Sequence, residues 1–318
     1  MRKFYKLLLM FLFAVSFMFF TTGCKEKTAQ IELPQNITLT TEEQQPSLKV
    51  YDINSKSIVT MELEEYIKGV LAGEMFNDWP IEALKAQAIL VRTYTLYYLQ
   101  NSTSKYPGAD ISNDVTEAQA YDASKINDNI EHAVNETRGK VILCDGELIE
   151  AWFHSNSGGV TTAAKTGLNY LGQENYTKTT KSPETTENSE NFEWSITFTK
   201  SEVLSALREM GVSVTTISEF LVGEKDDSGR AVTLRIGGAE FSASTFRLKI
   251  GSTKMKSTLI DNIVVSKNSI SISGKGYGHG VGMSQWGAKV LAQDGKTAEE
   301  IIDFYFDNIE ICNAKYEK

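Results

Sequence analysis

Hydrophobic positions recur at helical spacing in two consecutive segments near the start of the body of the chain. The apolar face of the first segment, which ends near Glu74, consists of Leu63, Ile67, Val70 and Leu71. Thr60 is available to cap this helix. The second segment is "DWPIEALKAQAILVRTYTLYYLQ", where Asp78 can act as the cap and Pro80 suits the first turn. The sequence therefore predicts two helices joined by the loop "GEMFNDW".

Other segments have the alternation and the β-rich composition that are typical of strands. "LKVYD" and "SIVTMEL" precede the two helices. "GKVILCDGELIEAWFHS" predicts a hairpin, because Asp145-Gly146 is a favoured two-residue turn. Later segments turn at Gly237-Gly238 and near Asn268. We therefore expect several antiparallel hairpins.

Further helices are predicted after Thr199 or Ser201, in "GMSQWGAKVLAQDG", and after Thr297. The segment 173–191 is polar and poor in apolar residues, so we expect it to be a mobile surface excursion. We find no internal repeat. Helices mixed with antiparallel hairpins predict an α+β fold, with a single domain over residues 49–318.

The first 23 residues have the layout of an export signal. A basic start is followed by an apolar run from Leu7 to Phe20, which is shorter than the roughly 18 apolar residues of a membrane-spanning helix. "TTGC" resembles a bacterial lipoprotein box, although Thr21 stands where leucine is usual. We expect lipidation of Cys24 and an extracytoplasmic protein held at the cell membrane. An ordinary secretory signal and an uncleaved anchor are the alternatives.

Composition and charge agree with an exported globular protein. The 318 residues are 41% hydrophobic and 23% charged, with a formal net charge of −9. The body is more acidic still, because the first 23 residues contain three basic residues and no acidic one. This charge argues against nucleic acid as a partner. Residues 24–48 are polar and unpatterned, so we predict a flexible tether before a domain that begins near Lys49.

The remaining cysteines do not form a recognisable framework. If Cys24 carries lipid, only Cys144 and Cys312 are left, and whether they pair stays open. A metal site shared by Cys144 and His154 is not expected, since a straight hairpin arm would separate His154 from the turn by roughly 26 Å.

Glu74 is the first candidate for catalysis. It is predicted to lie at the C-terminal end of a helix, beside Met75, Phe76 and Trp79. The helix dipole places partial negative charge there, and apolar neighbours desolvate the carboxyl group, so both effects favour the protonated acid. A general acid requires this property, whereas the alternative is a solvated surface glutamate.

Two other segments combine glycines with polar side chains. "HSNSGG", which contains His154, ends a strand with groups that allow close approach of a ligand, although a plain loop is the alternative. His279 lies between glycines where a strand turns toward a helix. Because glycine has no side chain, its neighbours should shield the His279 ring little. A structural histidine is the alternative. Sequence spacing does not show whether these segments meet Glu74.

Four segments, taken in order, resemble the signatures of the SpoIID/LytB family, the stage II sporulation protein D and amidase-enhancer group of Gram-positive bacteria. They are "GVLAGEM", "WPIEALKAQAILVRTYTL", "AWFHSNSGG" and "GKGYGHGVGMSQWGAKVLAQDGKTAEEIIDFYF". The resemblance covers about residues 50–312. It implies a glycan-binding cleft and, for sporulation members, a lytic transglycosylase. Such an enzyme cuts peptidoglycan strands between N-acetylmuramic acid and N-acetylglucosamine, preferring strands that a partner amidase has stripped of stem peptides.

The resemblance also implies roles for residues. Glu74 occupies the position of the family's catalytic acid, and His154 and His279 match its two histidine positions. Ordinary glycosidases use two carboxyl groups, whereas one suffices if the muramoyl C6 hydroxyl attacks its own anomeric carbon to leave a 1,6-anhydro end. The residues that we expect to bind sugar are His154, Ser155, Ser157, His279, Ser284 and Gln285. Stacking on a sugar face would suit Trp79, Tyr277 or Trp286.

No metal or other cofactor is assigned. Some clostridial relatives resemble zinc proteins with cysteines around this histidine segment, but "AWFHSNSGGVT" contains no cysteine. Two histidines are fewer than the three protein ligands usual for catalytic zinc. A weak site that uses His154, His279 and a water or carboxylate stays open.

Two other functions are considered. The chain could be a non-catalytic glycan-binding protein that recruits or stimulates a cell-wall amidase, and such a protein has no need of a desolvated acid at Glu74. A serine hydrolase built from His279 with Ser284 or Ser157 lacks a nucleophile-elbow motif and a third member.

Overall fold

The computed structural model describes residues 27–40 and 44–317. The predicted export signal and Cys24 therefore lie outside the described residues, and the predictions about them stay predictions. Among the residues that are described, no helix is both long enough and apolar enough to cross a bilayer.

The fold is α+β, as expected from the sequence. The α-helices of the described residues are α2 (Leu63–Glu74), α3 (Ile81–Asn101), α4 (Asp128–Glu136), α5 (Ala164–Gly167), α6 (Lys200–Glu209), α7 (Ala243–Ile250), α8 (Gln285–Gln293) and α9 (Ala298–Tyr305). The longer strands are β1 (Thr28–Glu32), β3 (Pro46–Asp52), β4 (Ser57–Glu62), β6 (Lys140–Cys144), β9 (Glu193–Thr199), β11 (Thr233–Ile236), β12 (Ala239–Ser242), β13 (Leu259–Val265), β14 (Ser269–Lys275) and β16 (Glu310–Glu317). The short ones are β2 (Thr38–Leu39), β5 (Ile111–Ser112), β7 (Glu147–Leu148), β8 (Phe153–His154), β10 (Leu221–Val222) and β15 (Met283–Ser284).

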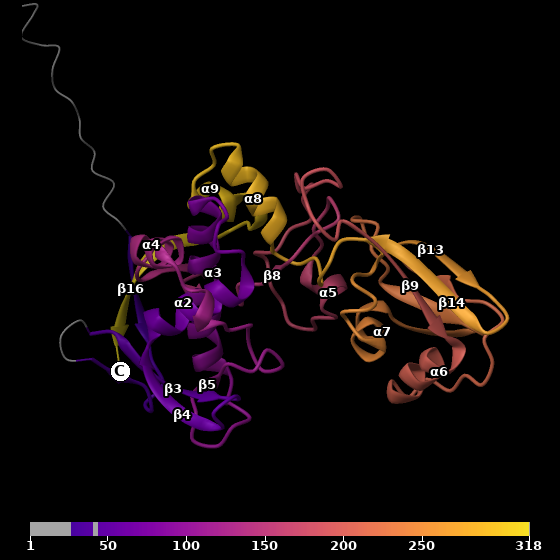
Figure 1. Cartoon of the computed structure of the whole chain (residues 1–318), viewed down its shortest axis with the longest axis horizontal. Coiled ribbons are helices and arrows are strands. Elements are labelled where there is room, and N and C mark those ends of the chain that lie inside the picture. Colours follow the sequence, from indigo (N-terminus) through magenta and orange to yellow (C-terminus); the bar gives the residue numbers. More distant parts are fainter. Residues whose placement is uncertain (1–26, 41–43, 318) are drawn as a thin grey trace, which may run out of the picture.

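Buried apolar side chains form two separate clusters, a division that the sequence analysis did not predict. The first surrounds α2 and α3 and includes side chains of α8, α9 and β6. The second lies between the antiparallel sheets β13-β14-β9 and β10-β11-β12 and the helices α6 and α7. Figure 1 shows α2 and α3 toward one end of the long axis and β9, β13 and β14 toward the other, with β8 and α5 between them.

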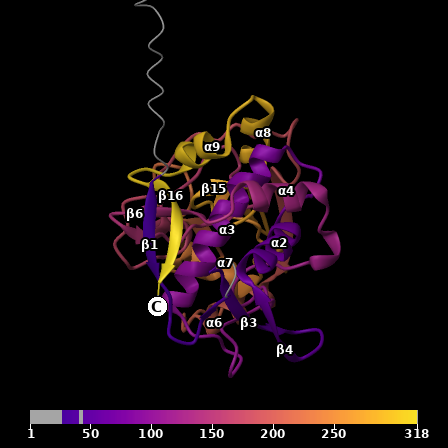
Figure 2. The same cartoon turned by 90° about the vertical axis from the view of Figure 1, so that its left-hand side faces the viewer.

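The prediction of a flexible tether over residues 24–48 is wrong for much of that segment. Strand β1 pairs in parallel with β16, as Figure 2 shows at the edge of the molecule. Ile31, Leu33 and Ile37 are buried in the first core. The sequence of this segment alone did not predict the strand, because most of its residues are polar. The strand that pairs with it lies near the other end of the chain.

Local signals predicted the turns and some of the caps. Thr199 and Thr297 form the capping boxes of α6 and α9. Thr60 instead lies in β4, and α2 begins without a side-chain cap. Asp78 does not cap α3 either, because Pro80 occupies the cap position. A cap needs a defined backbone conformation as well as a suitable side chain, which explains both errors.

The predicted hairpin forms between β6 and β7, with Asp145 and Gly146 at positive φ values of 52° and 87°. Its second arm stops at Leu148, so the straight arm toward His154 does not form. Cys144 and Cys312 are buried free thiols, which settles the question of their pairing.

Candidate functional site

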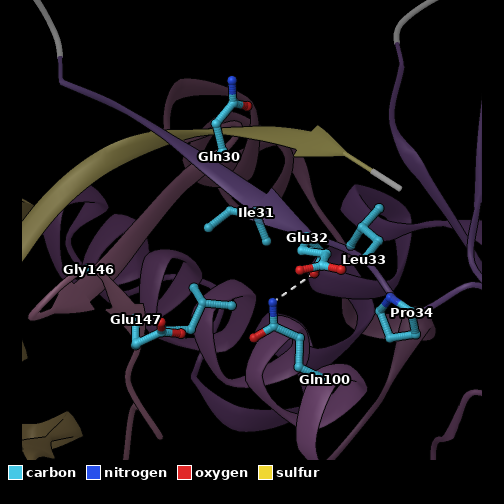
Figure 3. Close-up of a pocket in the computed structure, with 9 residues that line it drawn as sticks. Gln30, Ile31, Glu32, Leu33, Pro34, Gln100, Gly146 and Glu147 are labelled. Carbon is cyan, nitrogen blue, oxygen red and sulfur yellow. Dashed lines mark hydrogen bonds between the residues drawn. The ribbon is translucent and has the colours of Figure 1, made fainter.

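A cavity of ≈ 590 Å³ brings together most of the predicted site residues. The predicted residues that line it are Glu74, His154, Ser155, His279 and Gln285. They come from the C-terminal end of α2, from β8 and the following residue, from the glycine-rich segment after β14, and from the start of α8. A second cavity of ≈ 500 Å³ beneath β1, where Gln100 Nε2 donates to the Glu32 carbonyl oxygen at 2.8 Å, has none of these residues in its wall (Figure 3).

Backbone pairing explains why two distant segments meet at this cavity. Strand β8 pairs in parallel with β15. Just beyond β8, the Asn156 N–H donates to the Tyr277 carbonyl at 2.9 Å, and the Tyr277 N–H donates to the Asn156 carbonyl at 2.7 Å. The segment that contains His154 and the segment that contains His279 are thus held side by side along most of their length.

The glycines on either side of His279 allow close packing, and they do not expose the histidine as the sequence suggested. A Cβ atom on Gly278, whose φ is +121°, would lie 2.6 Å from the Cβ of His154. A Cβ atom on Gly280, whose φ is +84°, would lie 2.5 Å from the Cζ of Arg230. His279 itself is half-buried. Glycine is therefore required at both positions by backbone conformation and by space.

Hydrogen bonds hold both the side chain and the backbone of Glu74 in place. Its Oε1 accepts the backbone N–H of Ala120 at 2.7 Å, and its backbone carbonyl accepts Gln285 Nε2 at 3.2 Å. Burial raises the pKa of the Glu74 carboxyl above its ordinary value, while the bonds with Ala120 and Gln285 oppose this shift. Burial was one of the two causes expected from the sequence.

The two histidines are neutral, and their roles as donor and acceptor differ. His154 Nδ1 lies 3.0 Å from the Val281 carbonyl oxygen, so Nδ1 carries the proton and Nε2 is left as an acceptor. This Nε2 atom is buried and has no hydrogen-bond partner. His279 Nδ1 accepts the Val281 N–H at 3.1 Å, and its ring also bonds to the backbone of Phe153. Burial lowers the pKa of both rings, that of His279 to about 3.

The lowered pKa of His279 predicts a pH-dependent stability. In the unfolded chain the ring takes up a proton near its ordinary pKa of 6.5, whereas the folded chain does not until about 3. The free energy of unfolding therefore falls as pH drops through this window. We expect His279→Gln to reduce the slope between about pH 6 and pH 4 by up to about 1.4 kcal/mol per pH unit, measured by urea unfolding.

The matched control for this experiment is His132→Gln, at an exposed position on α4. It should leave the slope of the wild-type protein unchanged. If His279→Gln and the wild-type protein show equal slopes, the neutral state assigned to His279 is wrong.

The structure places Ser157 and Ser284 away from the cavity where the predicted sugar contacts would form. Both are fully buried and outside the cavity wall. Ser157 donates to Glu184 Oε1 from its backbone N–H at 2.8 Å and from its hydroxyl at 2.5 Å, and the Ser284 hydroxyl donates to the same oxygen at 2.6 Å. The Ser182 hydroxyl donates to Glu184 Oε2. These serines therefore hold the two site segments against a common carboxylate.

Glu184 lies in the segment 173–191, which the sequence analysis expected to be a mobile surface excursion. That expectation is wrong here, because Glu184 and Ser182 are buried. This segment has no periodic apolar pattern that would predict its burial. The only signal in the sequence is the pair of serines, Ser157 and Ser284, whose hydroxyl groups need a common acceptor.

Comparisons with known proteins identify the family of this chain. Residues 51–143 match the family model described as stage II sporulation protein, and residues 161–282 match a domain of unknown function. Stage II sporulation protein D of Bacillus subtilis is 30% identical over 306 residues, which cover 91% of this chain and 86% of that protein. The chain belongs to the SpoIID/LytB family.

Two other relatives are similar over long stretches. An uncharacterized protein of Brachyspira hyodysenteriae is 34% identical over 298 residues, which cover 92% of this chain and 78% of that protein. The amidase enhancer of Bacillus subtilis is 31% identical over 296 residues, which cover 76% of this chain but 39% of that longer protein.

The aromatic residues of this SpoIID/LytB chain differ in what they offer to a ligand. Trp79 and Trp286 are buried and pack on each other with ring centroids 4.8 Å apart, beneath the ammonium group of Lys289. Tyr277 lines the cavity. Phe76, which was not proposed for stacking, is 56% exposed and contacts both tryptophans. Of the three predicted stacking residues, Tyr277 alone faces the cavity.

Metal-binding groups were also considered for this SpoIID/LytB chain. Within residues 27–40 and 44–317, no three His, Cys, Asp or Glu side chains are grouped so that they could hold a metal ion. The assignment of no cofactor stays a prediction. Of the two histidines, His154 alone has a ring nitrogen without a protein partner.

Proposed function

We propose that this chain is a lytic transglycosylase that cleaves peptidoglycan glycan strands between N-acetylmuramic acid and N-acetylglucosamine. The observation that carries the proposal is the state of Glu74. It is the sole carboxyl group among the described residues that line the cavity, and burial raises its pKa. A carboxyl group whose pKa is raised is suited to donate a proton as a general acid.

A single carboxyl group is sufficient for this reaction. Glu74 donates its proton to the glycosidic oxygen as the bond from that oxygen to the muramoyl C1 breaks. The C6 hydroxyl of the same muramoyl residue attacks C1 and forms the 1,6-anhydro bond, and the Glu74 carboxylate takes up the hydroxyl proton. The acid is thereby restored and no water is consumed. An inverting or retaining hydrolase would need a second carboxyl group on the opposite face of the sugar.

The remaining lining residues would position the strand. His154, Ser155, His279 and Gln285 offer hydrogen bonds to sugar hydroxyls and N-acetyl groups, and Tyr277 offers a ring to a sugar face. Gln285 also bonds to the backbone of Glu74 at 3.2 Å, so it connects the binding wall to the acid.

The wider setting is part of the same proposal. Members of this family are linked to cell-wall processing, and one relative bears the name amidase enhancer. We propose a cell-wall amidase as the partner, with strands freed of stem peptides as the preferred substrate. We also propose that lipid on Cys24 holds the protein at the outer face of the cell membrane.

The second candidate function is a non-catalytic enhancer that binds glycan and recruits the amidase, which the amidase-enhancer relative favours. Mass spectrometry distinguishes the two. The full chain, in a mild detergent, is incubated with glycan strands freed of stem peptides. New 1,6-anhydromuramic ends support the transglycosylase. Intact strands that nevertheless bind the protein contradict it and favour the enhancer.

A further inference from the structure

Strand β4 is an exposed edge of the sheet β2-β3-β4. It pairs with β3 along one side, and its other side has no backbone hydrogen bond to any residue that the structure describes. None of its six residues is buried, and Ile58 and Val59, whose side chains point to opposite faces, are each 42% exposed. Figures 1 and 2 both show β4 near the lower margin of the molecule. The strand therefore presents an open hydrogen-bonding edge with apolar side chains on both faces.

This edge lacks the features that usually keep edge strands apart. Proteins protect such edges with charged side chains, prolines or β-bulges. Strand β13, the edge of another sheet, has an extra residue, Asp261, in its pairing with β14, and the Asp261 carboxylate lies 3.9 Å from Lys275 Nζ. By contrast, β4 pairs with β3 without a shift, and residues 57–61 include neither a charge nor a proline. Strand β4 is therefore suited to pair with a further strand.

The charges at the two ends of β4 match a second copy of the same strand. Lys56 and Glu62 are exposed, and neither forms an ion pair within the part of the chain that the structure describes. When two copies form one antiparallel sheet, the two-fold axis passes between a residue and the same residue of the second copy. An axis at Val59 places Lys56 opposite Glu62 of the second copy, at both ends of the pair. An axis at Ile58 or Thr60 does not bring these charges together.

The same register also matches the uncharged positions. Val59 faces Val59 of the second copy, and Ile58 faces Thr60. β-Branched pairs and opposite charges that lie directly across antiparallel strands stabilise the pairing, whereas like charges oppose it. The net charge of −9 opposes association of two copies in general, so the contacts between Lys56 and Glu62 supply a local attraction that the rest of the surface does not.

We propose that β4 joins two copies of this chain in a symmetric dimer, with the two strands antiparallel about an axis at Val59 and one continuous sheet across both copies. No residue of β4 lines the cavity that contains Glu74, so the inference does not rest on the proposed function. Each dimer then has two such cavities, and a polymer with repeating units can bind both at once.

The test replaces Val59 by cysteine in the full chain, in a mild detergent, and measures the covalent dimer that forms under mild oxidation. Residues directly opposite in an antiparallel pair have Cα atoms about 4.5–5.5 Å apart, within the span of a disulfide. We expect several-fold more dimer from Val59→Cys than from Val264→Cys, the matched control at a similarly exposed valine on β13. The wild-type chain gives the background from Cys24, since Cys144 and Cys312 are buried.

Charge reversal tests the register. In the Val59→Cys chain, Lys56→Glu and Glu62→Lys should each lower the yield of covalent dimer several-fold, because like charges then face each other at both ends of the pair. The chain with both reversals has opposite charges again and should recover the yield. Both residues are exposed, so melting temperatures should stay close to that of the wild-type protein and show that each variant is folded.

The outcomes are distinct. Equal yields from Val59→Cys and Val264→Cys overturn the proposal. A high yield from Val59→Cys that neither charge reversal lowers also overturns it, because the strands then do not meet in the register that pairs Lys56 with Glu62. Loss of the dimer in each single reversal and its recovery in the double reversal support the proposal. None of these results depends on strand cleavage, which tests the proposed function separately.

Discussion

Replacement of Glu74 by glutamine is expected to reduce strand cleavage by about 10²–10⁴-fold while the protein still folds and binds glycan. A glutamine keeps an oxygen that can accept the Ala120 N–H, now 2.7 Å from Glu74 Oε1, so the local structure should be preserved. It cannot donate an acidic proton to the glycosidic oxygen. The measurement is the rate at which 1,6-anhydromuramic ends appear, followed by mass spectrometry beside a binding assay and a melting curve.

The matched control is Glu65→Gln on the same helix. The Glu65 carboxylate is exposed and pairs with Lys68 at 2.5 Å, so its loss should change cleavage little. If Glu74→Gln keeps most of the wild-type rate, the acid is another group and the proposed mechanism is wrong. A wild-type protein that binds strands without cutting them would make the comparison irrelevant and favour the amidase enhancer.

Local signals in the sequence predicted the elements that carry the site. The hairpin turn at Asp145-Gly146 and the helix that begins after Thr297 depend on neighbouring residues alone, and both are confirmed. The position of Glu74 at the end of a helix was predicted for the same reason. What spacing could not show was that Glu74 and the two histidines share a cavity, since that depends on pairing between β8 and β15.

The wrong predictions concern residues whose contacts are made by segments distant in sequence, whereas the correct ones depended on neighbouring residues. Strand β1 is stabilised by β16, near the other end of the chain. Glu184 lies in a polar segment and is nevertheless buried, where it accepts the hydroxyl groups of Ser157 and Ser284. A short polar segment looks like a loop when read alone, and only the complementary segment shows that it is part of the core.

Removal of Glu184 is expected to destabilise the protein by about 3 kcal/mol or more, and this prediction tests the least expected feature of the site. The carboxylate accepts hydrogen bonds from Ser157, Ser182 and Ser284, all of them buried. Glu184→Ala leaves these donors without an acceptor, and each unsatisfied buried donor costs about 1–3 kcal/mol. Some hydroxyls can turn to other partners, as Ser182 can to the Tyr305 hydroxyl at 2.7 Å, so the penalties should not add fully.

Urea unfolding measures this effect, with Glu187→Ala, at an exposed position three residues further on, as the control. Equal stabilities of the two variants would show that Glu184 does not hold the serines. Because Ser157 and Ser284 belong to the two segments that carry the site histidines, glycan binding should weaken together with stability in Glu184→Ala. In Glu74→Gln cleavage alone should be lost. These two patterns separate a residue that builds the cavity from one that acts within it.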